Sequence, residues 1–174
     1  ASSGATITCN AGSWTWTTPV VVTNKSLTIF GAGIDQTIIT TDTNGASPLQ
    51  INLQTTTNTF RVSGFTWKLQ SGAGSSGIIY LGISNVAGYP PVCCRVDHMK
   101  MYGDPMDGVS NGGRFIVFGA VYGLVDHVTM ISLTTRGAGN ISMIPDNVIS
   151  TSNNYHIPIT LGDQKALYIE DNVF

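Results

Sequence analysis

Arg95-Val-Asp-His-Met-Lys-Met101 is the stretch that decides the fold, because its pattern recurs along the chain. Each copy has an apolar residue, two small or polar residues, and then a second short segment that ends in a large apolar residue. A repeat of this kind indicates a solenoid, in which each unit buries its apolar side by stacking on its neighbours. The other copies are Arg61-Val-Ser-Gly-Phe-Thr-Trp67, Leu124-Val-Asp-His-Val-Thr-Met130 and Tyr168-Ile-Glu-Asp-Asn-Val-Phe174.

The copies align on aliphatic positions that we expect to point inward. Between copies the sequence supplies another short apolar strand and turns of different length, so each coil would hold three strands joined by one tight corner and two variable turns. Equivalent strands of successive coils would then pair in parallel. The sequence therefore predicts an all-β parallel β-helix, with apolar columns formed by Val62, Val96, Val125 and Ile169, and by Phe65, Met99 and Val128.

Composition supports a strand-rich single domain. Helix-forming residues are scarce, whereas Val, Ile, Thr and aromatic residues are common, so little or no helix is expected. The 174 residues fit one domain spanning 1–174. The net charge is −2 and 10% of the residues are charged, so the chain lacks the basic surface that a nucleic-acid-binding protein needs. No apolar run is long enough to span a membrane. The three cysteines, Cys9, Cys93 and Cys94, are interpreted as buried thiols.

The corner of each repeat carries a restricted set of residues. The equivalent position is Gly64, His98, His127 and Asp171 in turn. A two-residue corner often needs left-handed backbone, which glycine adopts freely and which Asn, Asp and His adopt more often than other residues. The two Asp-His pairs also suggest a base with its orienting carboxylate, or a metal site at Asp97 and Asp126. We favour the structural interpretation, because backbone geometry alone accounts for both histidines.

The sequence resembles the right-handed parallel β-helix proteins of the pectin lyase-like superfamily. The resemblance lies in Ala11-Gly-Ser-Trp-Thr-Trp16, Leu27-Thr-Ile-Phe-Gly-Ala-Gly33 and Tyr168-Ile-Glu-Asp-Asn-Val-Phe174. It implies a right-handed β-helix of about five coils, with residues 1–25 as an N-terminal cap region. Family members are longer, so the chain is interpreted as a fragment of a longer solenoid, whose open last coil is a surface for self-association. The resemblance also implies an extracellular or cell-surface location.

Members of this superfamily include polysaccharide lyases and hydrolases, phage tailspikes and adhesins. In the enzymes the substrate groove follows one sheet, which maps here onto residues 49–54, 78–81, 115–118 and 157–161. If the inward residues of this sheet are Ile51, Ile79, Ile116 and Ile159, its outward face carries no carboxylates. No Ca²⁺ cluster and no pair of hydrolase carboxylates is evident there, so Ca²⁺ is implied by the resemblance alone and no other cofactor is indicated.

The site residues that we predict lie around this sheet. A Gly/Pro/Asp-rich loop beside it supplies the catalytic candidates, although a plain turn followed by a solvated Arg is the favoured interpretation of that loop. Outward aromatic residues and a second long loop supply the substrate-binding candidates, although packing of the aromatic residues beneath the loops is the favoured interpretation. The catalytic candidates are Asp104, Asp107 and Arg114, and the substrate-binding candidates are Tyr80, Phe115, Arg136 and His156.

The expected function is therefore that of a secreted or surface protein that binds or acts on polysaccharide. If the protein is an enzyme, the resemblance implies a polysaccharide lyase or a glycoside hydrolase. The alternatives are a non-enzymatic module, such as a tailspike or adhesin shaft, and an inactive fragment. Fold alone does not distinguish them.

Overall fold

The structure is a computed structural model of the 174-residue chain. It describes residues 2–43, 46–53, 57–69, 77–83, 94–102, 114–119, 121, 123–131, 139–144 and 167–174. All regular secondary structure in these ranges is β-strand, which confirms the all-β prediction for the part described. The strands are β1 (Ala5–Thr8), β2 (Gly12–Trp16), β3 (Val20–Thr23), β4 (Leu27–Phe30), β5 (Thr37–Thr41), β6 (Leu49–Leu53), β7 (Phe60–Ser63), β8 (Thr66–Leu69), β9 (Ile79–Ile83), β10 (Cys94–Tyr102), β11 (Arg114–Gly119), β12 (Gly123–Ile131), β13 (Gly139–Ile144) and β14 (Leu167–Glu170).

Every strand pair is parallel, and each strand pairs with its equivalent in the next repeat. One ladder runs β1–β4–β7–β10–β12–β14, and a second runs β2–β5–β8–β10–β12. The long strands β10 and β12 belong to both ladders. The third ladder, β3–β6–β9–β11–β13, is a separate sheet. These parallel strands in curled sheets are compatible with a β-solenoid.

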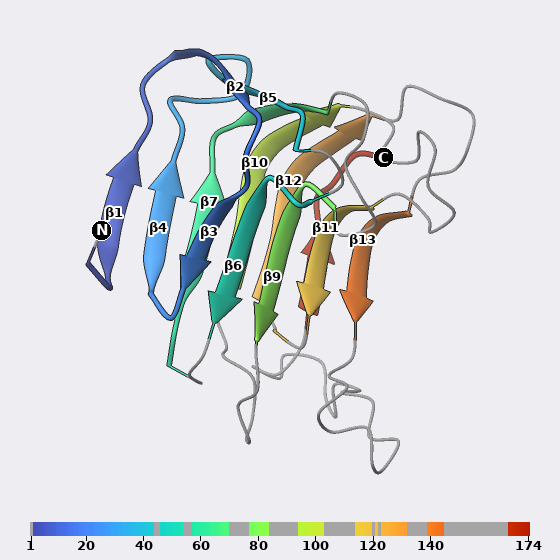
Figure 1. Ribbon diagram of the computed structural model, residues 1–174. Coiled ribbons are helices and arrows are strands. Elements are labelled where there is room, and N and C mark those ends of the chain that lie inside the picture. The colour runs from blue at the N-terminus through green and yellow to red at the C-terminus, as the bar shows by residue number, and fades with distance from the viewer. Residues whose placement is uncertain are drawn as a thin grey trace.

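Figure 1 shows how the sheets face each other. The strands β1, β4 and β7 run in one direction along one layer, and β3, β6, β9, β11 and β13 run in the opposite direction along the layer in front of it. The strands β2 and β5 lie along the edge that joins the two layers. Residues 5–23, within the predicted N-terminal cap region, hold β1, β2 and β3, which pair in the same three ladders as the later strands.

The core lies between these layers and is built from the predicted columns. Val96 pairs with Val62 on one side and Val125 on the other, and all three side chains are fully buried. Ile169 pairs with Val125 in the last strand of the ladder and stays 49% exposed, because no further described strand covers it. The second column is also confirmed, since Phe65, Met99 and Val128 are all buried.

The predicted left-handed corners are confirmed. Backbone φ is 82° at Gly64, 50° at His98, 53° at His127 and 50° at Asp171. The corner interrupts the regular ladder between β10 and β12, and again between β12 and the segment that includes β14, so the backbone at these points needs other partners. The Asn172 side chain supplies two of them in the last repeat: its Oδ1 accepts from the Val128 amide, and its Nδ2 donates to the Val125 carbonyl.

The third sheet differs from the prediction in two ways. β11 lies between β9 and β13 (Gly139–Ile144), a strand that we did not predict, whereas residues 157–161, including Ile159, lie outside the described ranges. Phe115 was placed on the outward face as a ligand-binding candidate, but both Phe115 and Ile116 are fully buried. The Ile78 amide donates to the Phe115 carbonyl at the bend that precedes β9, and Ile78 is buried as well. Buried and exposed residues therefore do not alternate where the chain enters this sheet.

Candidate functional site

A ladder of charged side chains runs along the corner of the first sheet and connects three successive repeats. We call this group, Arg61, Arg95, Asp97 and Asp126 with the attached Ser63, His98 and His127, the corner ladder. Arg61 and Arg95 occupy the same register position on β7 and β10. Each arginine reaches diagonally to the aspartate two positions further along the next strand, a distance that long side chains span readily.

Asp97 is the most heavily engaged member of the corner ladder. Arg61 donates from Nε and Nη2 to its two carboxylate oxygens, at 2.8 and 2.7 Å. The Ser63 hydroxyl donates to Oδ2 at 2.9 Å, and Arg95 Nε lies 3.5 Å from Oδ1. The carboxylate is fully buried beneath these groups. Burial raises the pKa of Asp97, but the hydrogen bonds from Arg61, His98 and Ser63 outweigh that effect and bring the pKa below its ordinary value.

Asp126 repeats this arrangement one strand further on. Arg95 donates from Nε at 3.0 Å and from Nη2 at 2.7 Å, in the two-pronged geometry that suits a guanidinium and a carboxylate. Burial raises the pKa of Asp126, and hydrogen bonds from Arg95 and His127 more than offset it, so this pKa is also lowered. The next strand offers Glu170 opposite Asp126, but Leu124 stands in the arginine position, so the Arg–Asp repeat stops here.

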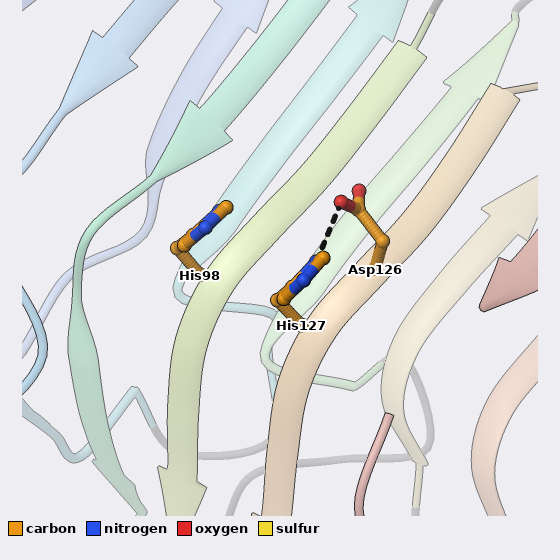
Figure 2. A group of neighbouring side chains, drawn as sticks. All are labelled: His98, Asp126 and His127. Carbon is orange, nitrogen blue, oxygen red and sulfur yellow. Dashed lines mark hydrogen bonds and ion pairs between the residues drawn. The ribbon is translucent and has the colours of Figure 1, made fainter. Parts of the chain in front are cut away.

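The two histidines lie side by side on the outside of the corner. His98 Nδ1 lies 2.9 Å from Asp97 Oδ2, and His127 Nδ1 lies 2.9 Å from Asp126 Oδ2. The rings are stacked with centroids 4.8 Å apart and planes within 4° of parallel. Figure 2 shows both rings pointing the same way, with Asp126 beside His127. Each carboxylate therefore fixes the orientation of its imidazole, as in a base with its orienting acid.

The corner ladder makes the folded protein sensitive to acid. Because the pKa values of Asp97 and Asp126 lie below the usual value of about 3.9, the unfolded state binds more protons as the pH falls. The stability that these groups contribute is present above about pH 4 and is lost as the pH falls through their lowered folded-state values. We expect the urea midpoint, followed by circular dichroism, to drop steeply below about pH 4. An Asp97→Asn, Asp126→Asn double variant with the same acid slope would contradict this assignment.

A second polar face is formed by the outer side of the sheet β6–β9. Tyr80 pairs with Gln50, and Gly82 pairs with Asn52, so these four residues share the outward face. The phenol end of Tyr80 lies over Gly82, where a Cβ would overlap Tyr80 Cε1, Cζ and Oη. Tyr80, Gln50 and Asn52 are each half-buried. The absent side chain at Gly82 thus allows an aromatic ring to lie along the sheet beside two amides.

The structure brings only some of the predicted site residues together. Tyr80 lies on the outer face as expected, whereas Phe115 is in the core and cannot stack on a ligand in this conformation. Arg114 begins β11, and its side chain is not among those described. Asp97 and Asp126 are adjacent, but both are engaged by arginine. The other predicted site residues lie outside the described ranges: Asp104, Asp107, Arg136 and His156.

Sequence reasoning missed the partners of the two aspartates. Arg61 and Arg95 precede the corner at the same position of the repeat, two residues before Ser63 and Asp97. Stacking the repeats in register would have placed each arginine beside the aspartate of the next coil. The aligned copies therefore held the information needed to pair each arginine with its aspartate. The role of Gly82 under Tyr80 had no comparable signal, because it depends on how one side chain lies along the sheet.

Comparison of the chain with family models, with curated proteins and with solved structures found no match. In the part of the chain that the structure describes, no helix has the length and apolar character needed to cross a membrane.

Proposed function

We propose that this protein is a single right-handed parallel β-helix of about five coils that binds polysaccharide, and that it is related to the pectin lyase-like superfamily. The pairing of strands in three parallel ladders, from i to i+3 in the first repeats and from i to i+2 where β10 and β12 each span two strand positions, supports the β-helix. The right hand follows from the strong preference of parallel crossover connections for that hand. A secreted or surface location is part of the same proposal.

The observation that carries the binding function is the position of Tyr80. Its phenol end lies over Gly82, and Gln50 and Asn52 follow on the neighbouring strand in register. An aromatic ring with a polar tip, flanked by amide donors and acceptors, suits a ligand that has apolar ring faces and hydroxyl edges. A sugar chain has both. The parallel sheet repeats along the solenoid, which suits an extended polymer.

We place binding ahead of catalysis because three carboxylates of the described residues are already engaged in ion pairs. Asp97 and Asp126 are held by arginine, and Asp35 pairs with Lys100 at 3.0 Å. A hydrolase would use two carboxyl groups that face the scissile bond. The corner ladder also ties consecutive repeats together, which favours a rigid shaft of the tailspike or adhesin kind as the second candidate function. A trimer in sedimentation analysis would support that candidate.

Tyr80→Ala is expected to weaken polysaccharide binding about tenfold, or about 1.4 kcal/mol, because the stacking surface is lost. A screen of acidic and neutral glycans would first identify the ligand, and titration of the variants would follow. Ultraviolet absorbance of unsaturated products, with and without Ca²⁺, would detect lyase activity in the same samples.

Two variants sharpen the test of this face. Tyr102→Ala removes another half-buried tyrosine, on β10, and should leave the affinity unchanged. Gly82→Ala should lift the Tyr80 ring and weaken binding while the fold is retained, since the overlapping atoms lie at the end of a movable side chain. The proposal fails if no glycan binds, or if Tyr80→Ala binds as tightly as the parent chain.

A further inference from the structure

The two histidines of the corner ladder have a chemical property that the polysaccharide proposal does not use. In each ring Nδ1 faces a carboxylate at 2.9 Å, so Nδ1 carries the hydrogen of the neutral imidazole. The lone pair is then on Nε2. In metal-binding histidines one ring nitrogen usually donates its hydrogen to a carboxylate while the other ring nitrogen binds the ion. The carboxylate fixes the tautomer and makes the metal-binding nitrogen more basic.

The two imidazole side chains are exposed on the same side of the molecule. The side chains of His98 and His127 are 55% and 53% exposed, and the stacked rings point in the same direction (Figure 2). Ligand atoms of the two rings and of Asp126 lie within 4.8 Å of one another. From this arrangement we infer that His98 and His127 bind one divalent transition-metal ion of the zinc, nickel and copper class through their Nε2 atoms.

Metal binding requires the rings to tilt out of their stacked arrangement. Two nitrogens bound to one ion at about 2.1 Å lie at most about 4.2 Å apart, and only about 3.4 Å apart in a tetrahedral site. The lone pairs of parallel rings point in the same direction, so each ring has to tilt toward the other until both lone pairs meet at the ion. Both side chains are half-exposed and held at Nδ1, which leaves their Nε2 ends room for this movement. Asp97 and Asp126 stay with their arginines as outer partners, and water completes the coordination.

The ligand set also defines which ions are expected. Imidazole nitrogen suits Zn²⁺, Ni²⁺ and Cu²⁺, whereas Ca²⁺ takes several oxygen ligands. The two carboxylates that would attract Ca²⁺ are neutralised by Arg61 and Arg95. The inferred site is thus distinct from the Ca²⁺ that the family resemblance implies. It is also independent of the Tyr80 face, which lies on another sheet.

Isothermal titration of the intact chain with ZnCl₂ and with NiCl₂ tests this inference. His98→Asn and His127→Asn should each lower the affinity at least tenfold, because each removes one of two ligands. Asparagine tolerates the left-handed backbone at these corners, so the fold should be retained, and circular dichroism would verify that. A change of the imidazole ¹⁵N signals on adding Zn²⁺ would show directly that Nε2 is the ligand.

The controls separate this site from unspecific binding. Asp171→Asn changes the same corner in the next repeat, where φ is also 50°, and should leave the affinity within twofold. His156→Asn, which alters the remaining histidine outside the described ranges, should do the same. Retained affinity in either His98→Asn or His127→Asn, an equal loss in either control, or equally tight binding of Ca²⁺ would each overturn the two-histidine site.

Discussion

Asp97→Ala is expected to lower the free energy of unfolding by about 3 kcal/mol, because it removes the acceptor at the centre of the corner ladder. The carboxylate is fully buried and receives two hydrogen bonds from Arg61 and one from Ser63. Breaking a buried ion pair by deleting one partner leaves the remaining groups without compensation. The arginine side chains are 38% exposed and regain water, so we expect the loss at the lower end of the range for buried pairs.

Urea unfolding at neutral pH, followed by circular dichroism, measures this loss. Asp35→Asn is the matched control, because it removes the charge of an aspartate that is also paired across repeats, with Lys100. That carboxylate is exposed, and exposed ion pairs contribute little to stability, so the midpoint should stay close to that of the parent chain. A similar, small loss in both variants would show that the corner ladder does not hold the repeats together.

The fold followed from the sequence where the repeat is local and unbroken. The columns through Val62 and Val96 and through Phe65 and Met99 depend on short strands on either side of a fixed corner, so alignment of the copies was sufficient to find them. The left-handed backbone at His98 followed for the same reason, since few residue types tolerate it.

The rest depended on information that the pattern lacks. The strand β13 beside β11 was not predicted because the repeat length varies, and a short apolar run does not reveal which coil it belongs to. The burial of Phe115 was not predicted because a strand pattern reports which face a residue lies on, but not which parts of the chain cover that face.

The candidate site was only half visible in the sequence. The Asp-His pairs were evident, and their geometric explanation was correct for the backbone. The arginines were not recognised as their partners, because an interaction between residues such as Arg61 and Asp97 appears only after the coils are stacked in register. Tyr80 was placed correctly by alternation, but the open position at Gly82 is a property of the folded sheet.

Gly123→Ala is expected to lower the free energy of unfolding by more than about 3 kcal/mol, because the added methyl group has no space. Gly123 begins β12 opposite Cys94 of β10, with φ of 150°. A Cβ there would overlap the carbonyl oxygen of Cys94. Backbone atoms cannot swing aside as a side chain does, so β10 and β12 would have to separate at the start of their pairing. The strain of positive φ adds to this loss.

The control for Gly123→Ala isolates the steric contribution. Gly4 also has positive φ, 79°, but nothing lies within 4 Å of the position of its Cβ. Gly4→Ala should therefore show backbone strain alone, about 1 kcal/mol. Guanidinium unfolding of both variants gives the difference directly. Equal losses would mean that β10 and β12 are not in such close contact at this end, and the register of the two strands that carry the corner ladder would be in question.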